Sequence, residues 1–107
     1  MEILFLPNGN LENYFKDNQL QQQLVRYCQT KLPIYVAQRS IKIKPVHGAL
    51  AHLFELKVRV GREFYRLAYF YQDQLIQVAY LSTTLQKVRF DHEANHYLKQ
   101  VNHANNH

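Results

Sequence analysis

The feature that most constrains the fold is a stretch of alternating apolar and charged residues at 53–60. Its apolar positions fall on one side and its charged positions on the other, in the order Phe54-Glu55-Leu56-Lys57-Val58-Arg59-Val60. This period of two predicts a half-buried β-strand. Two further runs rich in aromatic and β-branched residues follow at 64–71 and 75–81, each after a short polar segment. Three consecutive strands joined by tight turns predict an antiparallel meander.

Helical patterns flank this meander on both sides. A short strand at 3–6 ends in a turn, and apolar residues then recur at helical spacing over 11–32, with Asn10 as the expected cap and Pro33 as the end. A break near Asp17 and Asn18 would make this one bent helix or two short ones. The segment 34–52 leaves a short edge strand and an ordered loop equally open. A last helix is expected over 90–101, capped by Asp91, so the fold class is α+β.

Length and composition set the broad class of protein. The 107 residues suit one domain, which we expect at 1–101, followed by a frayed polar tail at 102–107. The single cysteine, Cys28, allows no internal disulfide and is expected to be a buried apolar residue. The N-terminal residues resemble neither a signal sequence nor a membrane span, so we expect a soluble protein of the cytoplasm that does not bind membranes.

The positive charge is concentrated in the middle of the chain. Segment 39–66 holds seven basic residues against two acidic ones, which accounts for the whole net charge of +5. The basic residues are Arg39, Lys42, Lys44, Lys57, Arg59, Arg62 and Arg66. Such clustering is typical of a surface that meets a polyanion, most often a nucleic acid.

Residues 53–71 also resemble a known family. The segments Leu53-Phe54-Glu55-Leu56-Lys57-Val58 and Phe64-Tyr65-Arg66-Leu67-Ala68-Tyr69-Phe70, with Gly61 between them, are similar to the strand core of RelE/HigB-like toxins of the RelE/ParE superfamily. The order of elements agrees over nearly the whole chain. The resemblance implies the toxin component of a type II toxin–antitoxin pair, a ribosome-dependent mRNA endonuclease that inhibits translation and binds a cognate antitoxin protein.

The resemblance also implies a site. Cleavage by a 2′-hydroxyl needs a proton acceptor, positive charge for the phosphorane and an acid for the leaving oxygen, and it requires no metal or other cofactor. Matching positions make Arg66 and Lys57 catalytic candidates, and Lys87 and His92 join them as residues beyond the last strand. The expected RNA-binding residues are Arg59, Arg89, Lys42 and Lys44.

Three alternatives to this assignment stay open. Many HigB-like members carry two lysines after the last strand, whereas this chain has Thr83 and Thr84. That departure favours a ParE-type toxin that inhibits DNA gyrase without cleaving RNA, or an inactive relic that binds only protein. At the level of single residues, Arg66 is alternatively an ion-pair partner of Glu55 or Glu63.

A second motif points to different chemistry. The segment His92-Glu93-Ala94-Asn95-His96 matches the helical signature of zinc proteases, in which two histidines bind the metal and the glutamate activates water. His103 is the nearest third ligand, but along one helix it lies about 16 Å from His92, too far to share an ion. We therefore expect no metal site.

Overall fold

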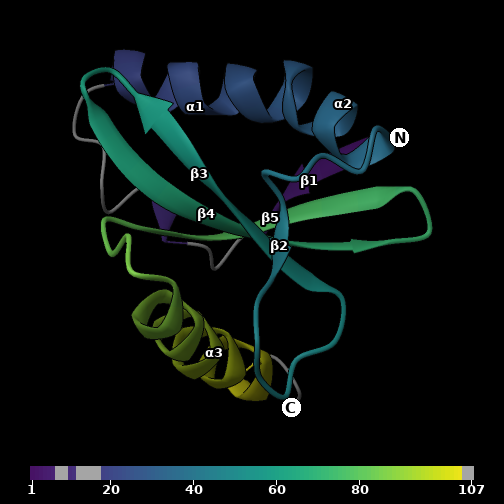
Figure 1. Cartoon of the computed structure of the whole chain (residues 1–107), viewed down its shortest axis with the longest axis vertical. Coiled ribbons are helices and arrows are strands. Elements are labelled where there is room, and N and C mark those ends of the chain that lie inside the picture. The colour runs from purple at the N-terminus through teal and green to yellow at the C-terminus, as the bar shows by residue number, and fades with distance from the viewer. Residues whose placement is uncertain (7–9, 12–17, 105–107) are drawn as a thin grey trace.

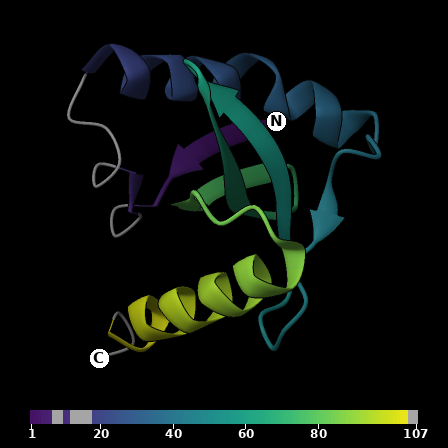
Figure 2. The same ribbon diagram turned by 60° about the vertical axis from the view of Figure 1, so that its left-hand side comes forward.

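The computed structural model describes residues 1–6, 10–11 and 18–104. Its elements are β1 (Glu2–Phe5), α1 (Asn18–Thr30), α2 (Leu32–Ala37), β2 (Lys44–Pro45), β3 (Leu53–Val60), β4 (Glu63–Gln72), β5 (Leu75–Ser82) and α3 (Lys87–Ala104). One sheet lies between two helical layers, with α1 and α2 on one face and α3 on the other (Figures 1 and 2). The α+β class and the order of elements expected from the sequence are confirmed.

The sheet is wider than the predicted meander. Its five strands run in the order β1-β5-β4-β3-β2, and β3, β4 and β5 form the expected antiparallel core. β1 adds parallel to β5 at one edge, and the two-residue β2 adds antiparallel to β3 at the other. The turn between β4 and β5 has positive φ angles at both Asp73 and Gln74, as a type I′ hairpin requires. The segment 34–52 thus contains both a helix and a short edge strand.

The N-terminal helices differ from their predicted form. The helical region is interrupted at Lys31, between α1 and α2. Pro33 lies in the first turn of α2 and does not end the helical region. This placement is favourable because a proline near a helix start gives up no intrahelical hydrogen bond. The side chain of Asn10, the expected cap, bonds the backbone N and O of Leu81 on β5 at 2.8 and 2.7 Å, and the residues 12–17 that follow it lie outside the described residues. The predicted break at Asp17 lies outside the described residues.

The C-terminal helix also departs from its expected bounds. α3 starts at Lys87 and continues to Ala104, so residues 102–104 of the predicted frayed tail are helical in backbone. Asp91 lies inside this helix and not at its cap, because the helix starts four residues earlier. Its carboxylate accepts hydrogen bonds from Lys87 and from the backbone N of His47. Within the described part of the chain, none of the helices is both long and apolar enough to cross a membrane.

Two cores hold the three layers together. The first packs α1 and α2 on the apolar side of the sheet and includes Leu24, Cys28, Leu56 and Tyr69. Burial raises the pKa of the Cys28 thiol to about 12, so this cysteine stays protonated and is a packing residue, as expected. The second core packs α3 on the opposite side of the sheet and consists of Val46, Leu53, Ala68, Ala79, Tyr80, Phe90, Ala94 and Leu98. The sheet is therefore buried on both faces where α3 lies.

Candidate functional site

The basic residues of the β3–β4 hairpin gather on the α3 side of the sheet. Lys57 lies directly opposite Arg66 in the strand register, and Arg59 lies directly opposite Phe64. Cross-strand partners place their side chains on the same face, so these four residues form one continuous surface, called here the hairpin surface. Lys57, Arg59 and Phe64 are exposed, whereas Glu55 on the same face of β3 is fully buried. The uncovered part of this face therefore begins at Lys57.

Phe64 is a member of the hairpin surface that the sequence analysis missed. Its ring is 47% exposed, and the Nζ of Lys57 and the guanidinium carbon of Arg59 lie 5.3 and 5.8 Å from the ring centroid. An exposed aromatic ring beside two cations suits an unpaired base with its phosphate. The alternation of side chains along the strand could have identified it. Tyr65 faces the apolar core, so its neighbour Phe64 faces the opposite, charged side of the sheet.

Arg66 is held in place by two short contacts. Its Nη1 donates to Oε2 of Glu55 at 2.6 Å, and its Nε donates to the carbonyl oxygen of Leu85 at 2.6 Å. The ion pair that was an alternative reading of the sequence is thus present. Glu55 has 0% exposed side chain and Arg66 has 17%, so this is a largely desolvated pair. Arg66 consequently has a fixed orientation on the hairpin surface.

Lys87 belongs to the same network but on its inner side. Its Nζ donates to both carboxylate oxygens of Asp91, at 2.5 and 2.6 Å, and to the carbonyl oxygen of Pro45 at 2.7 Å. It also lies 3.7 Å from Oε1 of Glu55. With its donors taken up in this way, Lys87 ties the first turn of α3 to β2 and β3. These contacts hold Lys87, one of the predicted catalytic residues, within the protein.

Glu93, the glutamate of the zinc-protease pattern, is occupied by hydroxyl groups. Tyr80 donates to it at 2.6 Å, Thr84 donates at 2.8 Å, and the Ser82 hydroxyl also bonds it. Burial alone would raise the pKa of Glu93, but these hydrogen bonds and the charge of Arg89 hold that pKa below its usual value. A carboxylate engaged in this way fastens the segment after β5 to α3 and is not placed to activate water. Among the described residues, no three His, Cys, Asp or Glu side chains come together to hold a metal.

The depressed pKa of Glu93 makes a prediction about acid stability. Its hydrogen bonds stabilise the fold above the unfolded-state pKa, which is that of an ordinary glutamate, and that contribution is lost as the pH falls through the lower, folded-state pKa. Glu93→Gln should therefore be less stable at pH 7 by about 2 kcal/mol, with a smaller loss on going to pH 3 than the wild type. Urea denaturation at both pH values measures this. Parallel pH profiles for the two proteins would contradict the assignment.

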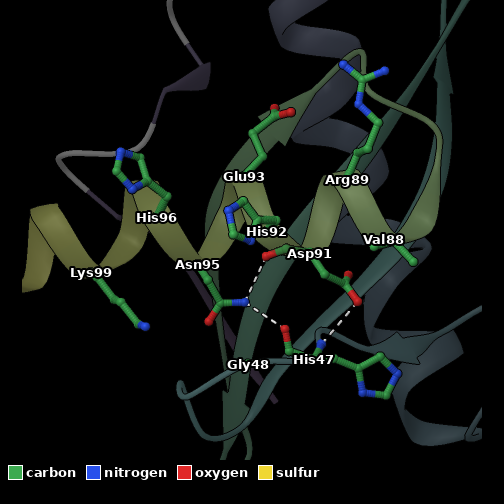
Figure 3. A pocket seen from close by; sticks show the side chains of 10 residues that line it. All are labelled: His47, Gly48, Val88, Arg89, Asp91, His92, Glu93, Asn95, His96 and Lys99. Atoms are coloured by element: carbon green, nitrogen blue, oxygen red, sulfur yellow. Dashed lines mark hydrogen bonds between the residues drawn. The ribbon is translucent and has the colours of Figure 1, made fainter.

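Arg89 and His92 lie on the outer side of α3, apart from the hairpin strands. Both line a groove of about 790 Å³ that runs between α3 and the His47–Gly48 segment, together with His96 and Lys99 (Figure 3). No hairpin-surface residue lines this groove. Arg89 nevertheless interacts with a residue close to the hairpin strands. Its positive charge lowers the pKa of Glu93, and Glu93 accepts a hydrogen bond from Ser82. Ser82 is the register partner of Arg66 on β5.

The two predicted RNA-binding lysines before the meander diverge in space. Lys44 pairs with Glu55 in the strand register, so its side chain shares the α3 side of the sheet and is exposed. Lys42 instead lies over the ring of Tyr35 in α2, with its Nζ 4.9 Å from the ring centroid. Tyr35 packs against the core on the opposite side of the sheet. The structure thus groups Lys44 with the hairpin surface and does not group Lys42 with it.

Comparison with known proteins adds no relative to this picture. No protein-family model matches the chain, and searches of curated proteins and of solved structures returned no match. The hairpin surface and the groove beside it are therefore what the molecule itself offers as evidence of function.

Proposed function

We propose that this chain is a RelE/HigB-type toxin that cleaves messenger RNA at the ribosome in the cytoplasm and is restrained by a cognate antitoxin protein. One observation carries the proposal. The hairpin surface exposes Lys57 and Arg59 close to the Phe64 ring, and neither cation forms an ion pair among the described residues. Cations free to bind phosphate beside an exposed aromatic ring match single-stranded RNA better than a folded duplex.

Arg66 supplies fixed positive charge for the reaction. Its Nε and Nη1 are engaged by Leu85 and Glu55, and its Nη2 has no hydrogen-bond partner among the described residues. A guanidinium that is already oriented stabilises developing phosphorane charge without reorganising during the reaction. In this proposal Lys57 and Arg59 position the phosphate, Arg66 stabilises its charge, and Lys87 serves only to hold the network together.

His92 is the proposed proton donor to the leaving oxygen. An imidazole can both give and take up a proton, which is what a general acid requires. It follows Arg89 by three residues on the exposed side of α3, which places it in the groove and not on the hairpin surface. The proposal therefore requires the RNA to pass from the hairpin surface over the first turn of α3. It requires no metal or other cofactor.

One observation favours a second candidate function, which is binding without cleavage. The charges of Arg66 and Lys87 are matched by Glu55 and Asp91 within the protein. A surface whose inner cations are already neutralised retains Lys57 and Arg59 for contacts with an acidic partner. This suits a ParE-type inhibitor of DNA gyrase or an inactive relic that binds only protein.

Induction of the protein without a partner separates these functions. We expect growth arrest with a rapid fall in amino-acid incorporation, while thymidine incorporation continues at first, because mRNA is the proposed target. The matched control is the Lys57→Gln/Arg59→Gln variant, which should grow normally at the same protein level. Unchanged protein synthesis with accumulating gyrase-linked DNA breaks would assign the ParE-type function instead. Normal growth on induction of the wild type would support the remaining alternative, an inactive relic that binds only protein.

A further inference from the structure

We propose that the groove along α3 binds a second stretch of the same RNA strand, through its phosphates, beyond the stretch held by the hairpin surface. This groove is defined by Arg89, His92, His96 and Lys99 on α3 and by the His47–Gly48 segment facing them (Figure 3). The inference rests on the proposed RNA binding at the hairpin surface and extends it to residues outside that surface. It also gives a role to His96, the second histidine of the zinc-protease pattern.

The wall of the groove opposite α3 is fixed in position. Asn95 donates from its Nδ2 to the carbonyl oxygens of His47 and Asp91, both at 2.8 Å, and the backbone N of His47 donates to Asp91 at 3.2 Å. At Gly48 an added Cβ would overlap the Asn95 amide, so only glycine permits this close approach. The groove is thus formed before any ligand binds, which lowers the entropic cost of binding.

The groove keeps a net positive charge, because Arg89 and Lys99 line it against one carboxylate without an ion-pair partner among the described residues, Glu93, whereas the charge of Asp91 is matched by Lys87. Asp91 is bonded by Lys87 and by the backbone of His47, and Glu93 accepts three hydroxyl groups. The basic residues and histidines of α3 that line the groove are Arg89, His92, His96 and Lys99. They recur at spacings of three, four and three, which keeps them on one side of the helix. From Arg89 to Lys99 they extend over about 15 Å, long enough for more than one phosphate.

The groove begins close to the hairpin surface, although no residue of that surface lines it. The backbone of Leu85 accepts a hydrogen bond from Arg66, and α3 begins two residues later at Lys87. Arg89 therefore lies at the end of the groove that is nearest to Arg66. An RNA strand leaving the hairpin surface passes Arg89 and the proposed proton donor His92 before it reaches His96 and Lys99. The imidazole of His96 provides a flat face for an unpaired base.

Labelled uridine oligomers of two lengths test this inference on the whole protein. Fluorescence anisotropy should show that a 12-mer binds about tenfold tighter than a 4-mer, because only the longer strand reaches the groove. The variant His96→Gln/Lys99→Gln should remove most of that advantage and leave the 4-mer unchanged. Loss of the Lys99 contact should also lower the salt dependence of 12-mer binding by about 0.7 in slope, the value for one phosphate on a single strand. Gly48→Ala should weaken the 12-mer in the same way through displacement of the groove wall.

The control variant is Arg26→Gln/Lys31→Gln, which removes two exposed charges from the α1 side of the sheet. If this control weakens the 12-mer as much as His96→Gln/Lys99→Gln does, the binding is general charge attraction and the groove assignment is overturned. A second outcome is that the control and His96→Gln/Lys99→Gln both leave binding of the 12-mer unchanged, while Lys57→Gln/Arg59→Gln weakens binding of the 4-mer and the 12-mer. In that case the groove assignment is overturned and the proposed RNA site stands. If Lys57→Gln/Arg59→Gln changes neither oligomer, the proposed RNA site itself fails.

Discussion

Arg66→Ala is expected to lower the free energy of unfolding by about 3–5 kcal/mol, because it leaves the Glu55 carboxylate buried without its partner. Glu55 has 0% exposed side chain, and Arg66 is its close partner at 2.6 Å, whereas Lys87 is 3.7 Å away and bound to Asp91. The same substitution also removes the tie between Arg66 and the carbonyl oxygen of Leu85. Urea denaturation at neutral pH measures the loss directly.

Two further variants make this result specific to the buried pair. Arg59→Ala removes an exposed arginine from the same sheet face and should cost less than about 1 kcal/mol. The double variant Glu55→Gln/Arg66→Gln removes both charges together and should recover a large part of the stability lost in Arg66→Ala. An Arg66→Ala protein as stable as Arg59→Ala would mean that Glu55 is not buried as an ion pair. Because of this structural role, loss of toxicity in Arg66→Ala alone says little about catalysis.

Lys57→Gln/Arg59→Gln is expected to lower RNA cleavage by about 10²-fold or more, since contacts to phosphate charge are worth several kcal/mol in such reactions. Both side chains are exposed and lie outside the ion pairs of the described residues, so stability should stay within about 0.5 kcal/mol of the wild type. Cleavage of a model mRNA on translating ribosomes and urea denaturation, measured on the same preparations, separate activity from folding.

A charge-matched control guards this second prediction. Arg26→Gln/Lys31→Gln lowers the net charge equally but acts on the opposite helical layer, so cleavage should change by less than about threefold. Phe64→Leu keeps an apolar side chain on the hairpin surface and removes the aromatic ring, and it should weaken binding of unpaired bases. Equal loss of cleavage in the control and in Lys57→Gln/Arg59→Gln would show that net charge, and not the hairpin surface, governs the activity.

Local patterns in the sequence were sufficient to predict the meander. The period of two at 54–60 indicated which side chains of β3 face the first core, and the confirmed register of β3 against β4 brings Lys57 beside Arg66. The joining of β1 to β5 and of β2 to β3 was beyond such reasoning, because both pairings depend on contacts between distant segments. The sheet consequently has five strands where the sequence analysis expected a three-stranded meander.

The candidate site was predictable only where it is exposed. The charged side of 53–60 predicts Glu55 at the surface, yet α3 packs over this end of the strand and buries it completely. That burial is what converts Arg66 and Lys87 from free cations into partners of carboxylates. Lys42 was grouped with Lys44 because they are two residues apart, but the chain between them passes from the α2 layer to the sheet edge.

The most direct test of the central claim is primer extension on an mRNA carried by translating ribosomes, after addition of the purified protein. The account predicts new 5′ ends within the coding sequence in the presence of a chelator, and their loss with Lys57→Gln/Arg59→Gln. Naked RNA of the same sequence should be cleaved far more slowly, as expected for an enzyme that acts at the ribosome. Intact mRNA on ribosomes in the presence of folded wild-type protein would contradict the account.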